Sequence, residues 1–549
     1  MIKGIWSLGL FFFLCHLHAQ SVPKVSNTYL IKGAIITSTP ESTPQIQDIL
    51  IKDGIIQKVG TNIKAPITAR IIQADSMYMY PGFIAAASHI GIVKPKDPSS
   101  PPKIERPGYP PNDLAGITPD ANSSDVYGSQ EGSITTMRKL GFSISHSMPY
   151  GKMLPGQTAI ISLNGKPFNE AVIAEDFGQY AQFKGASSMF PATTIGVMAK
   201  WREMYRNAEL ANNHAKRYKQ QARNLKRPDH DPATMALIPL TEGKQSVFFL
   251  AEEHVDIQRA LQLQKELGFD EVIVEAKRGE MSLEKVKNQG VKMLISLNLP
   301  KEMKKDTTKD LTAKKDEKAL LAERKQKAIT KYEVSGNTIS EAGLTAGFSF
   351  LEVKSKDIYP NIRRLIANGM SEQSALAHLT TLPATLLKID NIAGTLEKGK
   401  IANLVIFNKP IFEKKAIINM VMVDGVLHKI DAKKKKKKTN GETTNIEGTW
   451  SYKIEVPGLE PSGTLEFTKV EEAYNLSMTN STTPGETYEL TDQTMDGNSM
   501  IYSVDIDVQG TTVTLETEIT FDGDTFEGNV DVGEFGNFPI TGQKEGSPE

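Results

Sequence analysis

Apolar residues recur at two different spacings along this chain, and the spacing changes near residue 440. Before that point, short apolar runs typical of buried strands alternate with segments in which apolar residues recur at helical spacing. The strand candidates are Ala159–Ser162, Ser246–Ala251, Glu271–Glu275 and Val291–Leu297. The helix candidates are Val255–Leu267, Met281–Gln289 and Ile358–Ala367. Such alternation predicts parallel strands joined by helices.

Residues 446–549 instead alternate apolar and polar positions, which is typical of half-buried strands. The strand candidates are Thr464–Thr468, Ser499–Val508, Thr511–Ile519 and Thr525–Val532. Asp522-Gly523-Asp524 lacks the further oxygen ligands of a calcium loop, so we interpret it as a hairpin turn. This region is predicted to be a separate all-β barrel or sandwich domain.

The segment between these regions, residues 431–445, contains six consecutive lysines, Lys433–Lys438. Like charges repel, so we interpret the segment as a solvated linker, with a polyanion- or membrane-binding patch as the alternative. From Ile446 onward there are 21 acidic residues against 3 lysines, a net charge of −18, so the rest of the chain carries +17. This asymmetry favours two independently folding parts. We expect the lysines of the basic part to be solvated, with anion or membrane-surface binding as the alternative, and we expect no nucleic-acid partner.

The first twenty residues have the pattern of a signal peptide. Lys3 precedes an apolar run, Ile5–Leu17, and His18-Ala19-Gln20 offers a cleavage site. The run is too short for a membrane span, and no later stretch of the sequence is long and apolar enough. The single cysteine, Cys15, lies inside this segment. We therefore expect a periplasmic or secreted protein without disulfides.

Three groups of segments resemble the metal-dependent amidohydrolase superfamily, in particular its exported bacterial members of the imidazolonepropionase/dihydroorotase-like type. These are Tyr29–Thr37 with Asp48–Gly60 and Tyr80–Ile84, then Ile117–Asp120 with Gly185–Leu210, and finally Gly369–Leu387 with Gly394–Ile406 and Met422–Gly425. The resemblance implies a (β/α)8 TIM barrel over residues 83–390. It also implies a small composite β-sandwich from residues 21–82 and 391–430. Residues 301–331 are highly charged, and we expect a surface excursion there that includes a helix from Glu317 to Tyr332.

In this superfamily one or two divalent ions lower the pKa of a bound water, which attacks a carbon–nitrogen or ester bond of a small molecule. The resemblance implies ligands at the carboxyl ends of the strands: a His-x-His pair after strand one, Lys or Glu on strand four, histidines on strands five and six, and an Asp on strand eight. Zinc, manganese or iron would suit such a set.

This sequence departs from that pattern. In the first motif Ala85 replaces the acidic residue and Ala87 the first histidine, which leaves His89. Leu250 stands at the strand-five position, and strand six has no histidine. Leu351 stands at the strand-eight position, and Glu352, one residue later, is the remaining candidate for a catalytic carboxylate.

Other residues that could rebuild a site are His146, Lys184, Glu252 and His254. Each also has an ordinary explanation, because polar residues are common at strand and helix ends, and Glu275 and Glu352 are expected to be solvated. One imidazole does not hold a catalytic ion, since three protein ligands are the usual minimum.

Three functions follow as hypotheses. The protein is an impaired amidohydrolase homologue whose barrel binds or scaffolds, for example beside an active relative. Alternatively, it is a hydrolase of non-peptide carbon–nitrogen bonds with a mononuclear or rearranged metal site around His89. A third possibility assigns the function to the acidic β domain as a carbohydrate or protein binder. The sequence specifies no substrate.

Overall fold

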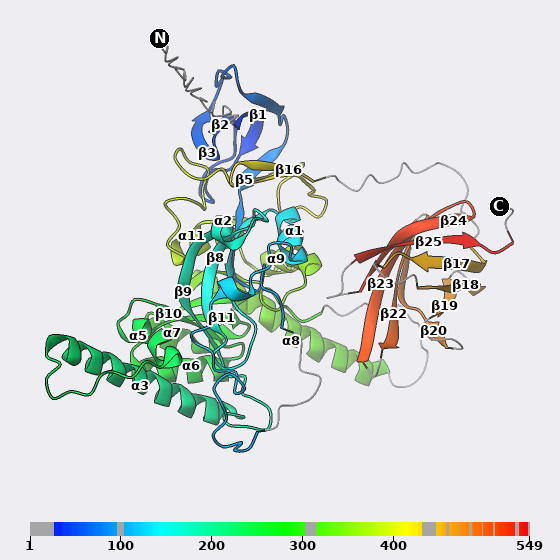
Figure 1. Cartoon of the computed structure of the whole chain (residues 1–549). Helices are drawn as coiled ribbons and strands as arrows, with labels where there is room; N and C mark the ends of the chain where they lie inside the picture. The colour runs from blue at the N-terminus through cyan, green and yellow to red at the C-terminus, as the bar shows by residue number, and fades with distance from the viewer. Residues whose placement is uncertain are drawn as a thin grey trace, which may run out of the picture. The chain divides into compact units, whose positions relative to one another are not determined.

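A computed structural model of the chain (Figure 1) describes residues 27–95, 104–301, 315–430, 446–456, 461–470, 473–481, 486–496, 498–508, 511–532 and 537–546. The chain divides into two compact units, Met1–Ala432 and Lys433–Glu549. The predicted signal peptide and the lysine-rich linker lie outside the described residues. No helix among the described residues is long and apolar enough to cross a membrane.

The first unit contains an eight-stranded sheet built from segments on both sides of the barrel in sequence. Its strands are β1 (Thr28–Ile36), β2 (Gln45–Lys52), β3 (Ile55–Gly60), β4 (Arg70–Gln73), β5 (Tyr78–Pro81), β14 (Leu404–Phe407), β15 (Ile418–Val423) and β16 (Val426–Lys429). The order is β16-β15-β14-β5-β1-β2-β3, with β4 paired to β1. The antiparallel pairing of β14 with β5 joins the two segments. The composite arrangement that the resemblance implied is therefore present, as one sheet.

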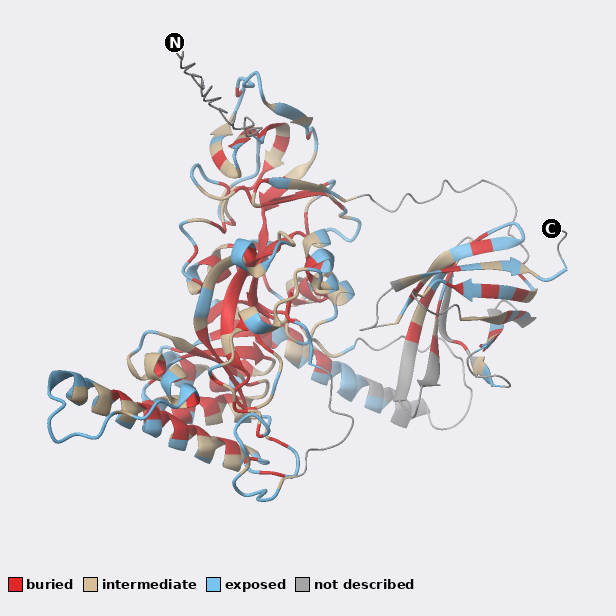
Figure 2. Ribbon diagram, in the orientation of Figure 1, coloured by how far each residue is buried: buried red, intermediate tan, exposed pale blue. Residues whose placement is uncertain are grey.

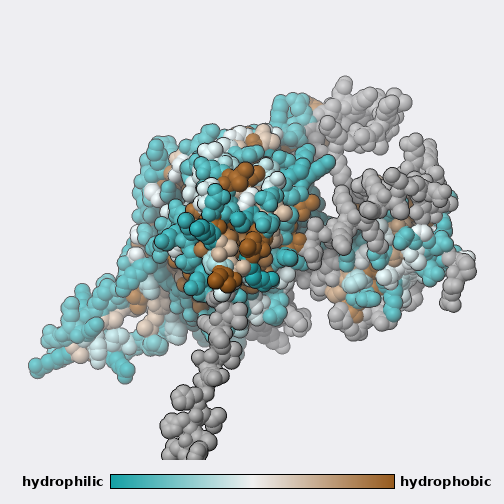
Figure 3. Space-filling view, turned by 90° about the horizontal axis from the view of Figure 1, so that it is seen from above, coloured by the Kyte–Doolittle hydropathy of each residue, from teal (hydrophilic) through white to brown (hydrophobic). Residues whose placement is uncertain are grey.

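Apolar side chains also lie on the outer surface at the composite-sheet end of this unit. Ile46, Ile67 and Ile71 are exposed there. Seen from above, apolar groups lie among hydrophilic ones (Figure 3). Exposed apolar side chains of this kind are ordinary on folded proteins.

Eight further strands close into a barrel whose interior is buried (Figure 2). They are β6 (Phe83–Ser88), β7 (Phe142–Ser147), β8 (Gly156–Ser162), β9 (Val172–Gln182), β10 (Ser246–Leu250), β11 (Asp270–Ala276), β12 (Lys292–Ser296) and β13 (Thr345–Ser349). The predicted barrel fold is confirmed. One strand departs from the all-parallel arrangement, because β8 runs antiparallel to both β7 and β9. A short loop without a helix joins β7 to β8, and only antiparallel neighbours can be joined in this way.

Helices lie in the connections between the other barrel strands. The α-helices are α1 (Gly132–Lys139), α2 (Phe168–Ala171), α3 (Thr194–Gln220), α4 (Pro232–Ala236), α5 (Ile238–Thr241), α6 (His254–Leu267), α7 (Leu283–Gln289), α8 (Lys315–Glu341), α9 (Ile358–Ala367), α10 (Glu372–Leu379) and α11 (Thr381–Leu386). Three short 3-10 helices accompany them: η1 (Ser123–Val126), η2 (Gly279–Ser282) and η3 (Ser355–Asp357).

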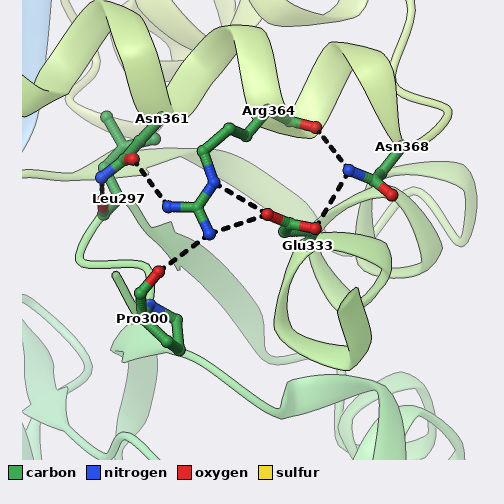
Figure 4. Close-up of polar contacts among 6 residues, drawn as sticks. All are labelled: Leu297, Pro300, Glu333, Asn361, Arg364 and Asn368. Carbon is green, nitrogen blue, oxygen red and sulfur yellow. Dashed lines mark hydrogen bonds and ion pairs between the residues drawn. The ribbon is translucent and has the colours of Figure 1, made fainter. Parts of the chain in front are cut away.

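Helix α8 contains the helix expected from Glu317 to Tyr332 and continues to Glu341. It is the crossover helix between β12 and β13, and Ile329 and Ile339 in its second half are buried. An ion pair fixes this half to α9 (Figure 4): Arg364 Nε lies 2.7 Å from Glu333 Oε1, and both side chains are largely buried. Arg364 also donates to the carbonyl of Pro300, in the segment after β12. The pair therefore connects two helices and the end of a barrel strand.

The second unit is a nine-stranded antiparallel sheet. Its strands are β17 (Gly448–Ile454), β18 (Ser462–Val470), β19 (Ala473–Thr479), β20 (Thr487–Glu489), β21 (Thr491–Asp496), β22 (Ser499–Val508), β23 (Thr511–Asp522), β24 (Thr525–Asp531) and β25 (Asn537–Lys544). The order is β20-β19-β18-β17-β25-β24-β23-β22-β21. Trp450 and Phe521 lie in its core, with ring centroids 5.0 Å apart. Asp522 pairs with Thr525 and Gly523 has φ +64°, so the predicted hairpin turn is present.

Candidate functional site at the carboxyl ends of the barrel strands

Several of the candidate residues lie where the strands of the barrel end. His89 directly follows β6, Lys184 follows β9 by two residues, and Glu252 follows β10 by two residues. Leu250 is the last residue of β10, and Glu352 lies three residues after β13. The carboxyl ends of parallel strands meet at one face of such a barrel, which is where sites are built on this fold. The barrel therefore brings these positions to one face.

His89 is held by its backbone neighbour and by two aromatic rings. Its Nδ1 lies 2.7 Å from the carbonyl oxygen of Met148, which can only accept, so Nδ1 carries the hydrogen and Nε2 keeps a lone pair. The ring stacks on Tyr150 at 3.9 Å and meets the edge of Tyr180 at 6.2 Å. Burial lowers the pKa of His89 to about 4, a shift that the Met148 hydrogen bond opposes and Lys184 assists. The imidazole is thus neutral near pH 7.

The positions at which the resemblance implies metal ligands or the acidic residue of the first motif are apolar and packed. Ala87 belongs to a cluster in the barrel interior that includes Met148 and Val274, and Leu250 and Leu351 pack against the same cluster. Ala85 is fully buried in the larger core of the unit. None of these four side chains has a lone pair to offer an ion.

His146 lies inside the barrel with both ring nitrogens used. Nδ1 donates to the carbonyl of Ala86 at 2.9 Å, and Nε2 accepts from the hydroxyl of Thr158 at 2.7 Å. Burial lowers the pKa of His146 to about 4, so the ring is a neutral core residue. His254 is the first residue of α6, and its carbonyl accepts from Ser282 Oγ at 3.5 Å.

Glu275, at the end of β11, is not solvated as the sequence suggested. It is fully buried, and its two oxygens accept hydrogen bonds of 2.5 Å from Ser296 and Ser349 on the next two strands. Its φ of +62° is uncommon for a residue with a side chain, and it coincides with a register irregularity in β11. Burial raises the pKa of Glu275, while the two serine hydrogen bonds act in the opposite direction. An acidic residue directly after the apolar run Val272–Val274 was the available sequence signal.

Glu252 is committed to an ion pair. Its Oε2 lies 2.6 Å from Lys277 Nζ, and its carbonyl accepts from the backbone N–H of Lys277 at 2.9 Å. Burial alone lowers the pKa of Lys277, but Glu252, with Glu275 and Glu352 nearby, outweighs burial and the pKa is raised. Glu352 itself is exposed. The cation that interacts with the carboxylates at this face is therefore the side chain of Lys277.

These residues do not fit a catalytic divalent ion. Over the described ranges no group of three or more His, Cys, Asp or Glu side chains could hold one. His89 Nε2 has a lone pair that could bind an ion, but the rings that contact His89 are those of Tyr150 and Tyr180, and Lys184 adds positive charge. The oxygens of Glu275 are used by serines, and Glu252 is paired with Lys277.

Comparison with known proteins finds a family match for part of the chain and a structural match for most of it. Residues 240–427 match the model of the amidohydrolase family. A 64-residue segment is 41% identical to 5-methylthioadenosine/S-adenosylhomocysteine deaminase from Pyrococcus furiosus, covering 12% of this chain and 15% of that protein. The crystal structure of an amidohydrolase from Thermotoga maritima MSB8 superposes with a TM-score of 0.59 and 21% identity, covering 73% of this chain and 100% of that one. At that identity the structural likeness supports the fold.

Proposed function

We propose that this chain, which belongs to the amidohydrolase superfamily, has lost metal-dependent hydrolysis and uses its barrel as a binding or scaffold module. The observation that carries the proposal is the apolar cluster in the barrel interior. Ala87, Leu250 and Leu351, which stand where the resemblance implies two histidines and an aspartate, all take part in it. A divalent ion placed there would lose its hydration without gaining ligands, which is strongly unfavourable.

The remaining polar residues support the same proposal, because they form hydrogen bonds and an ion pair with one another. Glu275 joins β11 to β12 and β13 through Ser296 and Ser349. Lys277 joins β11 to the end of β10 through Glu252. Side-chain hydrogen bonds and an ion pair thus connect the ends of β10, β11, β12 and β13. Association with an active relative is one role that we propose for such a barrel, and export to the periplasm or medium stays a prediction.

The alternative is a hydrolase with a mononuclear or rearranged site around His89. The free lone pair on His89 Nε2 and the exposed carboxylate of Glu352 favour it. Such a site would use zinc, manganese or iron bound by fewer protein ligands than usual.

Metal content and turnover separate these two functions. The full chain is purified without chelators, and bound metal is measured by elemental analysis alongside hydrolysis of a panel of amides, lactams and esters. We expect far less than one equivalent of metal and no turnover. Stoichiometric metal with hydrolysis that is lost in His89→Ala, but kept in His214→Ala, would refute the proposal. His214 is a suitable control because it lies on α3, outside the barrel interior.

A second candidate function belongs to the β domain. A hollow of about 480 Å³ lies over β17, β24 and β25, lined mainly by Ser451, Lys453, Thr525, Glu527, Thr541 and Gln543. Hydroxyl, amide and charged groups suit a hydroxylated ligand such as a carbohydrate. Glycan binding by the full chain that persists after deletion of residues 446–549 would exclude this assignment.

A further inference from the structure

A separate cavity lies at the opposite end of the barrel, where strands β10 and β11 begin. Its volume is about 260 Å³, somewhat below the roughly 300 Å³ at which pockets for drug-sized ligands start. The walls come from β9, from the segment that leads into β10, from β11 and from the end of α11. A cavity of this size suits a molecule as small as a single amino acid.

The floor of the cavity is apolar and firmly packed. Phe177 and Phe248 contribute their rings, whose centroids lie 6.0 Å apart. Val272 and Leu386 complete the floor, and all four residues belong to or pack against the apolar cluster of the barrel interior. An apolar group of a ligand could therefore be buried here without any movement of the core.

The rim of the cavity carries charges of both signs. Asp176 on β9 and Asp270 on β11 flank the start of β10, since Ser246 pairs with both Gly178 and Asp270. Lys388 stands on a different wall, two residues after α11. Glu175 and Lys244 also line the rim. Lys244 Nζ is paired with Glu242 Oε2 at 2.7 Å, so its charge is already engaged. Carboxylates on one side and Lys388 on another wall suit a small molecule that carries both an ammonium and a carboxylate group.

Two further observations distinguish this rim from an ordinary charged surface. Asp176 and Lys388 have φ values of +48° and +57°, which are unfavourable for residues other than glycine and are often found at functional sites. Gln245, in the wall, donates from Nε2 to the carbonyl of Asp176 and to Gln157 Oε1. These two hydrogen bonds hold the wall segment beside Asp176.

We infer that this cavity binds a free amino acid with an apolar side chain. The side chain lies on Phe177 and Phe248, and the ammonium group donates to Asp176 and Asp270. The carboxylate group pairs with Lys388. This inference does not depend on the proposed function, because none of these residues lies at the carboxyl ends of the strands.

Isothermal titration calorimetry on the full chain tests the inference with leucine and phenylalanine as ligands. Isoamylamine and 4-methylpentanoate are leucine analogues that lack the carboxylate and the ammonium group, respectively. Isoamylamine should bind about tenfold more weakly than leucine, the effect of losing one charge-assisted hydrogen bond, and 4-methylpentanoate should lose at least as much because it lacks the bonds to both Asp176 and Asp270.

Asp176→Asn and Lys388→Gln should each weaken leucine binding about tenfold as well. Asp390→Asn removes an exposed carboxylate that does not line the cavity and should leave the affinity unchanged. The inference is wrong if neither amino acid gives a saturable signal at about 10 mM, or if binding is unaffected by both rim substitutions. Circular dichroism of each variant verifies that the fold is retained.

Discussion

Glu271 provides a quantitative test of how the barrel tolerates charge. It lies near the start of β11 with 6% of its surface exposed, and both carboxylate oxygens are buried without a hydrogen-bond partner among the described residues. Burial raises the pKa of Glu271 from its ordinary 4.5 to about 8. Within the folded protein the group is therefore protonated at neutral pH, whereas in the unfolded chain it is ionised.

The sign and size of the effect follow from proton linkage. Between pH 4.5 and about 8 the folded state binds one more proton than the unfolded state, so stability falls as pH rises. Each pH unit corresponds to about 1.4 kcal/mol, and the full loss is about 5 kcal/mol above pH 8. Glu271→Gln cannot ionise. Relative to the native chain, its free energy of unfolding should rise by about 4 kcal/mol from pH 5 to pH 8.5.

Urea unfolding across this pH range measures the difference. Replacing Trp6 and Trp450 by Phe leaves the buried Trp201 as the fluorescent reporter of the first unit. Asp270→Asn, one residue earlier and exposed, should change the free energy of unfolding by less than about 0.5 kcal/mol. If the native and Glu271→Gln proteins lose stability with pH in parallel, Glu271 does not titrate as its burial requires.

Three other predictions use the same unfolding measurement. Arg364→Met leaves the buried Glu333 carboxylate without its cation, with only the Asn368 amide as a partner, and should cost about 3–5 kcal/mol. The double substitution Arg364→Met/Glu333→Leu should recover most of this loss, and equal losses in both would contradict the ion-pair explanation. Glu275→Gln should cost about 1–3 kcal/mol, because an amide offers one acceptor oxygen to two serine donors; an unchanged midpoint would argue against these bonds. The pKa of His146 is about 4 when folded, so the unfolded state binds the extra proton between pH 6.5 and 4, and stability should fall on acidification by about 3 kcal/mol. His146→Asn should remove that part of the pH dependence, and an unaltered acid slope would refute it.

The sequence predicted the bounds of helices and strands better than it predicted how they pair and pack with one another. Helix α9 and strand β22 have the predicted bounds, because each is encoded by a local periodicity that the residues carry themselves. The direction of β8 could not be read in this way, since it depends on which distant strands pair with it. The role of α8 depends similarly on packing against α9.

The candidate site was likewise predicted only in part. Ala87, Leu250 and Leu351 could be named from the sequence because the resemblance implies metal ligands at their positions. The burial of Glu275 was not, because the sequence does not say that Ser296 and Ser349 supply its hydrogen bonds. The cavity at the amino end of the barrel also had no sequence signal, as its rim joins residues more than two hundred positions apart.

The apolar residues at the positions where the resemblance implies metal ligands also have consequences for stability. Imidazoles and carboxylates gathered in a barrel without an ion would be desolvated and would include like charges, which opposes folding. Leucines at those positions instead bury apolar surface, and a fully buried leucine stabilises by about 1.5–3 kcal/mol; Leu250 and Leu351, which are partly buried, gain a part of this. The strand ends are further connected by Lys277 with Glu252 and by the serines around Glu275. The stability of this barrel should therefore not depend on a bound metal ion. A chelator such as EDTA should leave its urea unfolding curve unchanged. A shift of the midpoint to lower urea concentration would mean that an ion still stabilises the native state.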